Sequence, residues 1–389
     1  MMKILIVLTY YRPHTSGLTI YAERLANALA KRGHRVTVLT SQFEKSLPKN
    51  EVLNGVKIVR IPVLFRLSKG VIMPSFGYMA TKLVLENDVI QLHLPQFDAA
   101  GVALRGRILK KPTIITYHCD LLMPSGILPW IANQAVHIMN DLAAIFAHKI
   151  VTYTMDYAEN SKYLNRNLNK LNVILPPVIL PEVKSDYIAD FDKENNPEKK
   201  KPVIGMAVRF ATEKGVEVLL NALPEVLKEF PNALIQFAGP YENIIGEEEY
   251  FKRLIPTIRK YEESGNWKFV GVLSPEQMSA YYPNLDLLVL PSLNSTEAFG
   301  LVQIEAMMNG IPCIASNLPG VRQPVKMHDM GEIIEIGNSK ELSSAIIKIL
   351  KNPKKYKNDP EKIRSNYLPD MIAIEYEELF DSIQKEISS

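Results

Sequence analysis

The sequence predicts an α/β protein built from two Rossmann-like, doubly wound domains, and three observations support that prediction. The chain has 389 residues, and a single hydrophobic core usually stops growing below that size, so two domains are expected. Short apolar runs alternate with amphipathic stretches in both halves, as in parallel sheets whose strands are joined by helices. Between the halves, Lys184 to Lys201 is charged and poor in apolar residues, which predicts an exposed linker.

The N-terminal half begins with a strand, a helix and a second strand. Ile4–Leu8 is an apolar run, Thr19–Arg32 has apolar residues at helical spacing, Gly33 ends that helix, and Val36–Leu39 resumes as a strand. This order predicts a parallel sheet, because parallel strands need a crossover connection. The later strands of that sheet are expected at Val56–Ile61, Val89–Leu92, Thr113–Tyr117 and Lys149–Tyr153.

The same alternation restarts after the charged stretch and predicts a second doubly wound domain. Its strands are expected at Val203–Ala207, Leu234–Ala238, Trp267–Val270, Leu285–Leu290 and Pro312–Ala315. Its helices are expected at Gly215–Phe230, Glu247–Glu262, Pro275–Tyr282, Ala298–Asn309 and Ser339–Lys351.

Composition indicates a globular protein of the cytoplasm. Hydrophobic residues make up 47% and charged residues 22% of the chain, which argues against disorder. The two cysteines, Cys119 and Cys313, lie far apart and form neither a disulfide framework nor a spaced metal pattern, as expected in a reducing compartment. The first ten residues are too short and too polar at their far end for a signal peptide, and are expected to form a buried strand.

Charge is distributed unevenly along the chain. Residues 1–185 contain 22 Lys and Arg against 11 Asp and Glu, whereas the remainder contains 23 against 31. Such asymmetry suggests that the N-terminal half faces an anionic partner. No RNA- or DNA-binding motif is recognisable, so nucleic acid is not expected. An anionic membrane surface or a phosphorylated acceptor fits the charge better.

Residues 121–140 contain no Asp, Glu, Lys or Arg and are long enough to span a membrane. Pro124, Pro129 and several polar residues argue against a span. Two interpretations stay open: an interfacial segment at a membrane, and a partly buried loop and helix near the acceptor.

Ligands of parallel sheets bind outside the carboxyl ends of the strands, so candidate residues are sought on loops that follow strands. Residues 291–300 follow an expected strand and open an expected helix. Unpaired backbone N–H groups at that helix start, on Phe299, Gly300, Leu301 and Val302, suit a phosphate.

Two carboxylates flank this helix start. Glu297 lies in the loop and Glu305 in the helix, a separation of about 12 Å if all eight positions were helical. One carboxylate could then reach a sugar while the other reaches the ribose of the same nucleotide, because carboxylates accept paired hydroxyl hydrogen bonds well. The alternative is that both glutamates only favour a helix N-terminus and a solvated face.

Two cations follow the first strand of the second half. Arg209 and Lys214 lie on the loop after Val203–Ala207. Such a pair can bind a diphosphate and neutralise a departing nucleoside diphosphate. The alternative is that both side chains are merely solvated.

The first loop of the N-terminal half, Tyr10–Gly17, also follows a strand. Gly17 would allow close backbone approach to a phosphate of the donor. The loop has no GxGxxG fingerprint, which argues against a nicotinamide or flavin enzyme. His14 is a candidate contact to donor or acceptor, or else a solvated loop histidine.

Two histidines follow further strands of the same half. His118 closes the strand Thr113–Tyr117, and His93 follows the expected strand Val89–Leu92 and is expected to line the same cleft. A neutral imidazole at a strand end can donate a hydrogen bond to a sugar or help to move the acceptor proton. Asp120 is expected to contact the acceptor or to orient His118. The alternative for His118 is a packed core histidine.

The segment from Glu297 to Glu305, with residues 306–316 after it, resembles the core signature of glycosyltransferase family 4. That signature has two glutamates separated by seven residues and then a run like E-A-x-x-x-G-x-P-V-I-A. The resemblance spans nearly the whole chain, because Arg209 and Lys214 are similar to the diphosphate-binding pair of the family, and the loop of Gly17 and the region of His118 also match. The sequence departs from the pattern at Cys313, Ile314 and residues 317–320.

The resemblance implies the GT-B fold, in which two Rossmann-like domains face a central cleft. Residues 1–185 would bind the acceptor, residues 200–368 would bind the nucleotide sugar, and the helix Asp370–Ile387 would pack back on the first domain. The implied activity is retaining transfer of a hexose from a UDP- or GDP-sugar to an acceptor hydroxyl, without metal or cofactor. In agreement, no Asp-x-Asp metal motif follows an expected strand.

The resemblance also implies roles for individual residues. Glu305 would bind the ribose and Glu297 the hydroxyls of the transferred sugar, while backbone amides at residues 300–302 hold sugar or phosphate. His118 would lie beside the transferred sugar. Retention without an obvious nucleophile fits a front-face mechanism in which the departing diphosphate helps to deprotonate the acceptor. Nothing in the sequence separates this mechanism from a covalent intermediate.

Three classes of protein therefore remain. A glycosyltransferase would act on a sugar, lipid or lipid-linked acceptor, in the cytoplasm or peripherally on the inner face of the plasma membrane. A nucleotide-sugar 2-epimerase of GT-B fold should not show Arg209 and Lys214 together with both glutamates. A non-enzymatic two-domain sugar-binding protein should carry an export signal and needs no cations for a diphosphate.

Overall fold

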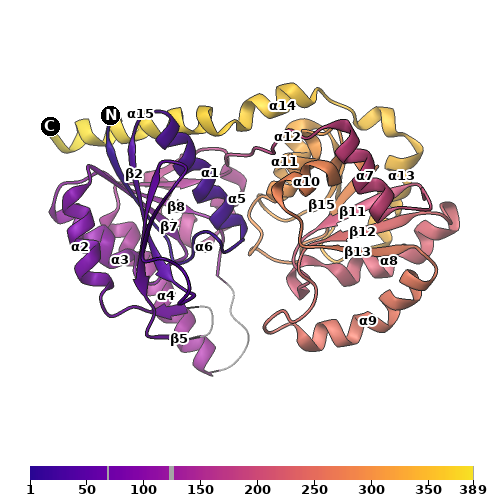
Figure 1. Ribbon diagram of the computed structural model, residues 1–389, viewed down its shortest axis with the longest axis horizontal. Coiled ribbons are helices and arrows are strands. Elements are labelled where there is room, and N and C mark those ends of the chain that lie inside the picture. Colours follow the sequence, from indigo (N-terminus) through magenta and orange to yellow (C-terminus); the bar gives the residue numbers. More distant parts are fainter. Residues whose placement is uncertain (68–69, 122–126, 389) are drawn as a thin grey trace. The chain divides into compact units, whose positions relative to one another are not determined.

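The computed structural model divides into two compact units (Figure 1). It describes residues 1–67, 70–121 and 127–388. For residue 67 and for residues 127–132, only the backbone is described. The first unit comprises Met1–Val178 and Tyr367–Ser389, and the second comprises Ile179–Asn366. The chain therefore enters the second unit once, leaves it once and ends in the first.

The first unit is built on an eight-stranded sheet with the strand order β10-β9-β8-β7-β1-β2-β4-β3. All its neighbouring strands are parallel except β3, which pairs antiparallel with β4. A separate hairpin joins β5 (Phe65–Leu67) to β6 (Gly70–Ile72). The strands of the sheet are β1 (Lys3–Val7), β2 (Arg35–Gln42), β3 (Asn50–Leu53), β4 (Val56–Pro62), β7 (Val89–Leu94), β8 (Thr113–Tyr117), β9 (Lys149–Thr152) and β10 (Leu171–Val173).

The crossover helices of the first unit follow its strands in the expected alternation. They are α1 (Gly17–Lys31), α2 (Phe76–Glu86), α3 (Ala99–Ile108), α4 (Ile127–Phe146), α5 (Met155–Asn160) and α6 (Lys162–Asn165). The first of them shows why these residues form a helix: the side chain of Ser16 accepts a hydrogen bond from the backbone N–H of Thr19 and caps the free donors of the first turn. Gly33, with a φ of 89°, follows its C-terminus in the left-handed conformation that ends many helices.

The terminal helix α15 (Pro369–Ser388) belongs to the first unit and packs along α1 (Figure 1). Tyr376 contributes a buried hydroxyl, 2.8 Å from the hydroxyl of Tyr21 on α1. At the surface, Arg32 forms ion pairs with Glu377 at 2.7 Å and with Asp370 at 3.1 Å. An apolar and hydrogen-bonded core flanked by ion pairs therefore holds the last helix of the chain on the first sheet.

The second unit has a six-stranded parallel sheet with the order β13-β12-β11-β14-β15-β16. Its strands are β11 (Val203–Ala207), β12 (Leu234–Ala238), β13 (Trp267–Gly271), β14 (Leu287–Leu290), β15 (Cys313–Ser316) and β16 (Gly331–Ile334). Its helices are α7 (Ser185–Asn195), α8 (Val216–Glu229), α9 (Glu248–Glu263), α10 (Pro275–Tyr281), α11 (Leu301–Met307), α12 (Gln323–His328), α13 (Ser339–Lys351) and α14 (Pro360–Tyr367).

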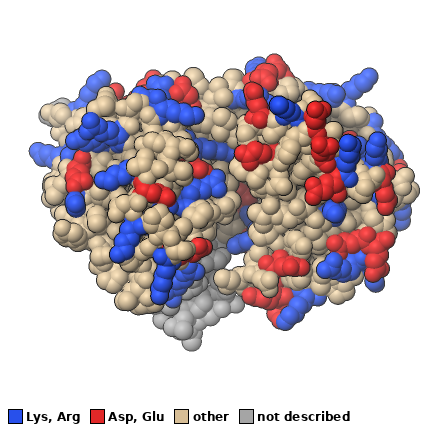
Figure 2. Space-filling view, viewed as in Figure 1, with Lys and Arg blue, Asp and Glu red and all other residues tan. Residues whose placement is uncertain are grey.

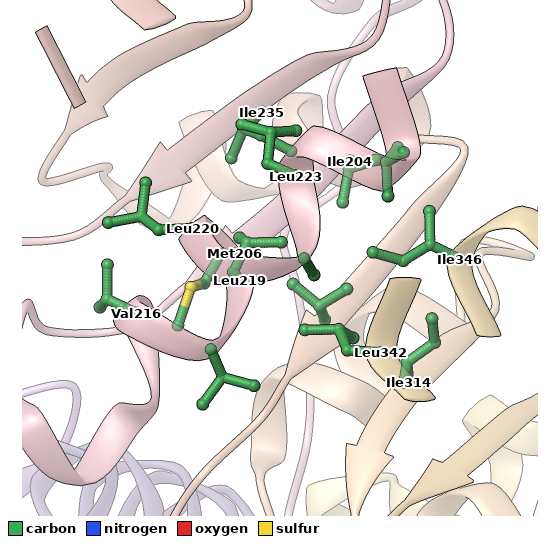
Figure 3. Close-up of a cluster of buried hydrophobic side chains, with 14 of the residues drawn as sticks. Ile204, Met206, Val216, Leu219, Leu220, Leu223, Ile235, Ile314, Leu342 and Ile346 are labelled. Atoms are coloured by element: carbon green, nitrogen blue, oxygen red, sulfur yellow. The ribbon is translucent and has the colours of Figure 1, made fainter. Parts of the chain in front are cut away.

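One face of this second sheet is covered by α8, α9 and α13, whose apolar stripes form a single core with the strands. Figure 3 shows Met206 from β11 among Leu219 and Leu223 from α8, with Ile346 from α13 close by. These side chains are fully buried, and burying each one stabilises the fold by about 1.5–3 kcal/mol. This core fixes the strand ends from which the loops of the candidate site project.

The prediction that Lys184 to Lys201 form an exposed linker is wrong, both in where the boundary lies and in the structure of these residues. Residues 185–195 form α7, which packs against α10, and Phe191 is buried against the ring of Tyr281. Asn196 is also buried and closes the turn after α7 through its contacts with Lys200. Phe191 is the buried residue of a helix that is otherwise rich in charged side chains. The boundary between the units therefore lies at residues 178 and 179.

The charge asymmetry is smaller in the folded units than along the sequence. The first unit contains 22 Lys and Arg against 16 Asp and Glu, because α15 brings six acidic residues to it. On the face shown in Figure 2, acidic side chains gather mainly over the second unit. Among the described residues, no helix is both long and apolar enough to cross a bilayer. Most of the uncharged stretch 121–140 lies in α4, whereas its residues 122–126 lie outside the described residues.

Candidate functional site

The second unit brings two loops together at the carboxyl ends of the adjacent strands β11 and β14. Gly215, in the left-handed region with a φ of 71°, makes this approach possible, because a Cβ atom there would lie 2.0 Å from the carbonyl oxygen of Pro291. The backbone N–H of Leu293 also donates to the carbonyl of Glu213 across the two loops at 2.8 Å. The fold therefore places the predicted cations next to the predicted carboxylate.

Lys214 and Glu297 form an ion pair at this junction. The ammonium Nζ donates to Glu297 Oε2 at 2.8 Å, and the side chains are only 16% and 21% exposed. Burial acts to lower the pKa of Lys214, but the charge of Glu297 and its hydrogen bond outweigh burial and raise that pKa above its ordinary value. Lys214 is therefore a fixed positive charge with two further N–H donors beyond this pair.

Arg209 lies on the same loop and pairs with Glu213, a residue that the sequence argument missed. Burial acts to raise the pKa of Glu213, but a backbone hydrogen bond and the charge of Arg209 lower it below the usual range. Each of the two predicted cations is thus paired with a carboxylate, Arg209 with Glu213 and Lys214 with Glu297. Glu213 could have been predicted from the sequence, because it lies between Arg209 and Lys214 on the same loop.

Glu305 lies deeper in the second unit than a solvated face would place it. It is on α11, is 7% exposed, and accepts a hydrogen bond at 2.8 Å from the hydroxyl of Tyr282, which is fully buried on the 3-10 turn Tyr282–Asn284. The alternative that Glu305 merely lies in solvent is wrong.

The turn before α11 is shaped by Gly300. Its φ of 81° is left-handed, and a Cβ atom there would lie 2.4 Å from Leu290 Cδ2. The sequence predicts that this helix begins at Ala298, but in the structure it begins at Leu301. Phe299 is buried, and its carbonyl accepts a hydrogen bond from the side chain of Gln303 at 2.9 Å. Leu301 and Val302 are half-buried in the first turn of the helix.

In the first unit, the two predicted histidines lie together at the ends of β7 and β8. Their rings are stacked with centroids 5.0 Å apart, and His93 Nδ1 and His118 Nε2 share a hydrogen bond of 2.8 Å. The other ring nitrogen of His118, Nδ1, is hydrogen-bonded to the hydroxyl of Tyr153 at the end of β9. His93 is 1% and His118 is 6% exposed.

Burial keeps both imidazoles neutral. It lowers the pKa of His93 to about 3. It also lowers the pKa of His118 well below its ordinary value, with a smaller contribution from His93. Neutral rings need no counter-ion, and each can still donate one hydrogen bond and accept another. His93 Nδ1 is bonded to His118, and contact of His93 with an acceptor stays a prediction.

Aromatic rings and hydroxyls complete the surroundings of this histidine pair. The ring of Tyr21 meets His118 edge-on, with centroids 5.0 Å apart. Tyr376 of α15 is hydrogen-bonded to Tyr21 at 2.8 Å and to Thr116 Oγ1 at 2.9 Å. Tyr376 stands 355 positions from Tyr21 in the chain, so no local sequence pattern could have revealed the contact.

Asp120 belongs to a different set of contacts from His118. Its Oδ1 accepts hydrogen bonds from Tyr117 at 3.0 Å and from Ser161 at 2.6 Å. Its backbone N–H donates to the hydroxyl of Tyr157 at 2.6 Å. The expectation that Asp120 orients His118 is therefore wrong, whereas contact with an acceptor stays a prediction.

The loop after β1 contains a small aromatic cluster. His14 stacks on Tyr10 with centroids 4.9 Å apart and meets Phe43 edge-on at 5.7 Å. Burial lowers the pKa of His14. Gly17 is the first residue of α1, and a Cβ atom there would meet nothing within 4 Å. Space for a ligand thus exists at Gly17, although the fold itself does not require glycine there.

Within the described residues, no group of three or more His, Cys, Asp or Glu side chains could hold a metal ion. The polar groups at the strand ends are paired cations and carboxylates in the second unit and neutral rings in the first. This chemistry suits an anion in the second unit and an uncharged polyhydroxyl group in the first.

Comparison with known proteins matches each unit to one family model. Residues 15–178 match the model "Glycosyltransferase Family 4", and residues 188–366 match "Glycosyl transferases group 1". Together the two models span most of the chain, and each match lies within one unit.

Relatives match over nearly their full length. A phosphatidyl-myo-inositol mannosyltransferase of Mycobacterium leprae is 24% identical over 90% of this chain and 88% of its own. An N-acetyl-alpha-D-glucosaminyl L-malate synthase of Bacillus anthracis is 20% identical over 99% and 98%. Among solved structures, HepE of Anabaena in complex with UDP superposes with a TM-score of 0.76 at 18% identity, covering 98% of this chain and all of that one. These solved neighbours are GT-B glycosyltransferases, so the expected GT-B fold is confirmed.

Proposed function

The chain belongs to the family-4 glycosyltransferases of GT-B fold, and on that premise we propose that it is a retaining hexosyltransferase. It would move a hexose from a UDP- or GDP-sugar to an acceptor hydroxyl. The observation that carries the proposal is the ion pair between Lys214 and Glu297, which is largely shielded from water at the ends of β11 and β14. A cation and a carboxylate in contact suit a donor with a diphosphate next to a polyhydroxyl sugar.

In this proposal the donor contacts both members of the ion pair, Lys214 through its diphosphate and Glu297 through its sugar. Lys214 has three N–H donors and gives one to Glu297, so it can hold a diphosphate oxygen without releasing the carboxylate. Arg209 adds a second cation on the same loop. As the bond to the sugar breaks, negative charge develops on the diphosphate, and cations already in place stabilise it without reorganisation. Glu297, aligned by Lys214, accepts hydrogen bonds from hydroxyls of the transferred sugar.

For His118 of the first unit, the proposed role is that of a neutral histidine. Because the pKa of His118 lies well below its ordinary value, the imidazole is uncharged at neutral pH and cannot serve as a cationic acid. It acts as a hydrogen-bonding group beside the sugar, and the departing diphosphate takes the acceptor proton. Both ring nitrogens already have partners, so a bond to the sugar requires His118 to exchange one of them. No step of this scheme uses a metal or a cofactor.

The acceptor would be a lipid or a lipid-linked glycan at a membrane surface. Two observations support this choice: the first unit has an excess of basic over acidic residues, and one relative is named as a phosphatidyl-myo-inositol mannosyltransferase. A basic surface is attracted to anionic headgroups. On this proposal the protein is cytoplasmic and associates peripherally with the inner face of the plasma membrane.

The donor is tested by binding and by slow hydrolysis. UDP and GDP are added in thermal-shift measurements, and UDP-glucose, UDP-galactose, GDP-mannose and UDP-N-acetylglucosamine are screened for release of nucleoside diphosphate without acceptor. One nucleotide should raise the unfolding temperature, and sugars on that nucleotide should be hydrolysed. Lys214→Met should weaken nucleotide binding, and Lys252→Met is its matched control, because Lys252 is 71% exposed in the same unit. No response to any nucleoside diphosphate would contradict the proposal.

The acceptor class is tested separately by sedimentation with liposomes. Vesicles containing anionic phospholipid should bind the protein at low salt and release it as salt rises, because exposed charges are screened. Neutral vesicles are the control. Absence of binding to anionic vesicles at low salt would exclude the membrane-surface acceptor while leaving the transferase proposal in place.

A further inference from the structure

A buried pair in the second unit joins a phenol to a carboxylate. Tyr282 is fully buried, Glu305 is 7% exposed, and the phenol oxygen lies 2.8 Å from Glu305 Oε2. The two residues are 23 positions apart, one on the turn that follows α10 and the other on α11. A carboxylate this far from water needs hydrogen-bond donors, because a buried unpaired charge is costly.

The direction of this hydrogen bond is fixed. Burial, and then the charge of Glu305, raise the pKa of Tyr282 well above its ordinary value. The phenol therefore stays protonated and donates, and Glu305 accepts.

The bond restricts the orientation of the carboxylate. The last torsion of a glutamate side chain has a broad, shallow energy profile, so an unassisted carboxylate rotates easily. A carboxylate has about four lone-pair directions. One strong bond from a buried phenol can thus set its plane while the carboxylate keeps the capacity to accept further hydrogen bonds.

We propose that Tyr282 is a positioning residue whose hydroxyl aligns Glu305 to accept hydrogen bonds from the ribose hydroxyls of the donor nucleotide. This inference rests on the proposed function and on the role that the family resemblance implies for Glu305, which is to bind the ribose. It adds a residue outside the strand-end loops to the nucleotide site, and it assigns that residue a role in ribose recognition.

The neighbouring Tyr281 offers a matched control. It is equally buried, but its hydroxyl donates to the backbone carbonyl of Gln236 at 2.8 Å. Gly205 on β11 leaves room for it, since a Cβ atom there would lie 2.7 Å from the Tyr281 hydroxyl. Tyr281 thus supports the sheet, whereas Tyr282 supports the carboxylate. Tyr281→Phe and Tyr282→Phe each remove one buried hydroxyl from adjacent positions.

The test measures ribose preference by isothermal titration. Kd is determined for UDP and GDP and for their 2′-deoxy and 3′-deoxy forms, and the ratio of deoxy to ribo Kd defines the preference. Tyr282→Phe should lower the preference of the wild type about 3- to 10-fold, as expected for loss of one aligned hydrogen bond. Tyr281→Phe should leave the preference unchanged. A merely structural role would weaken ribo and deoxy ligands equally, and that result would overturn the inference.

If Tyr282→Phe does not fold, the ribose preference is measured instead for a double variant and for Glu305→Gln. Glu305→Gln removes the buried charge that the phenol serves, so the double variant Tyr282→Phe/Glu305→Gln avoids an unpaired carboxylate. Its ribose preference should equal that of Glu305→Gln alone, and a further loss would contradict the inference. If the wild type binds nucleoside diphosphates without preferring ribose, only this inference fails. If it binds none, the proposed function fails with it.

Discussion

The two units carry candidate sites at corresponding places, the carboxyl ends of parallel strands, but with opposite electrostatic character. In the second unit, Lys214 and Glu297 are charged and paired at 2.8 Å. In the first, His93 and His118 are stacked, buried and neutral. The same strand-loop-helix framework therefore supports both a charged and an uncharged site.

The difference shows how burial and charge constrain each other. A lysine that is mostly removed from water keeps its charge only beside a carboxylate, because desolvation otherwise favours the neutral form. A histidine can respond to burial by losing its proton at neutral pH, so it needs hydrogen-bond partners and no counter-ion. On the proposed function, the charged pair of the second unit would recognise an anion, and the neutral histidines of the first would face sugar hydroxyls.

The largest effect that separates the two sites should come from Lys214→Met compared with His118→Asn. Lys214→Met removes a cation from the diphosphate, so transfer should fall about 100- to 1,000-fold and the Kd for the nucleoside diphosphate should rise. His118→Asn should also reduce transfer, yet leave that Kd unchanged, because on the proposed function His118 lies beside the sugar and not beside the diphosphate. Initial rates and isothermal titration measure the two quantities.

Equal weakening of nucleotide binding by both variants is the outcome that would contradict this prediction. In that case His118 would take part in holding the nucleotide, and the division between an anion site and a sugar site would be wrong. Lys252→Met should behave as wild type in both measurements, which excludes a general effect of removing one positive charge from this unit.

An intermediate effect should separate the two glycines of the sites. Gly300→Ala places a Cβ atom 2.4 Å from Leu290 Cδ2 in a left-handed backbone, and should destabilise the second unit by about 1–3 kcal/mol. Gly17→Ala meets nothing within 4 Å, so stability should be unchanged. Urea unfolding measures both. If Gly17→Ala nevertheless weakens binding of the donor, the added methyl group blocks the ligand and not the fold. A Gly17→Ala variant with normal stability and normal donor affinity would remove Gly17 from the site.

Much of this organisation was predictable, because it depends on patterns that are local in sequence. Alternating apolar runs predicted most of the strands, and the rule that ligands lie at strand ends selected Lys214, Glu297 and His118. The sequence also predicted that the strands would be parallel, and only β3 departs from this within the main sheets.

The remainder depended on contacts between distant residues. Nothing in the sequence near Tyr282 indicates that its hydroxyl meets Glu305, and nothing near Tyr376 indicates a bond to Tyr21. Helix α7 was missed because its composition is charged, and a single buried aromatic, Phe191, anchors it. Likewise, nothing in the sequence near His93 indicates that its ring is hydrogen-bonded to His118.

The smallest effect is a difference between the units in how stability depends on pH. Burial lowers the pKa of four histidines of the first unit (His14, His93, His118 and His148) and of one in the second, His328. Below the unfolded pKa of about 6.5, the unfolded chain binds protons at these positions that the folded chain does not. Stability is therefore fully present above that pH and is lost as the pH falls. For His93 the loss continues to a pH of about 3, and each such group contributes at most about 1.4 kcal/mol per pH unit.

Between pH 6.5 and 5 the first unit should thus lose stability more steeply than the second. Proteolysis in urea, with peptides from β7 and β12 quantified separately, reports the two units in one sample. His93→Gln should flatten the pH dependence of the first unit alone, and His328→Gln that of the second alone. Equal slopes in the two units, unchanged by His93→Gln, would mean that the stacked histidines are protonated in the folded state, and the contrast between a neutral and a charged site would fail.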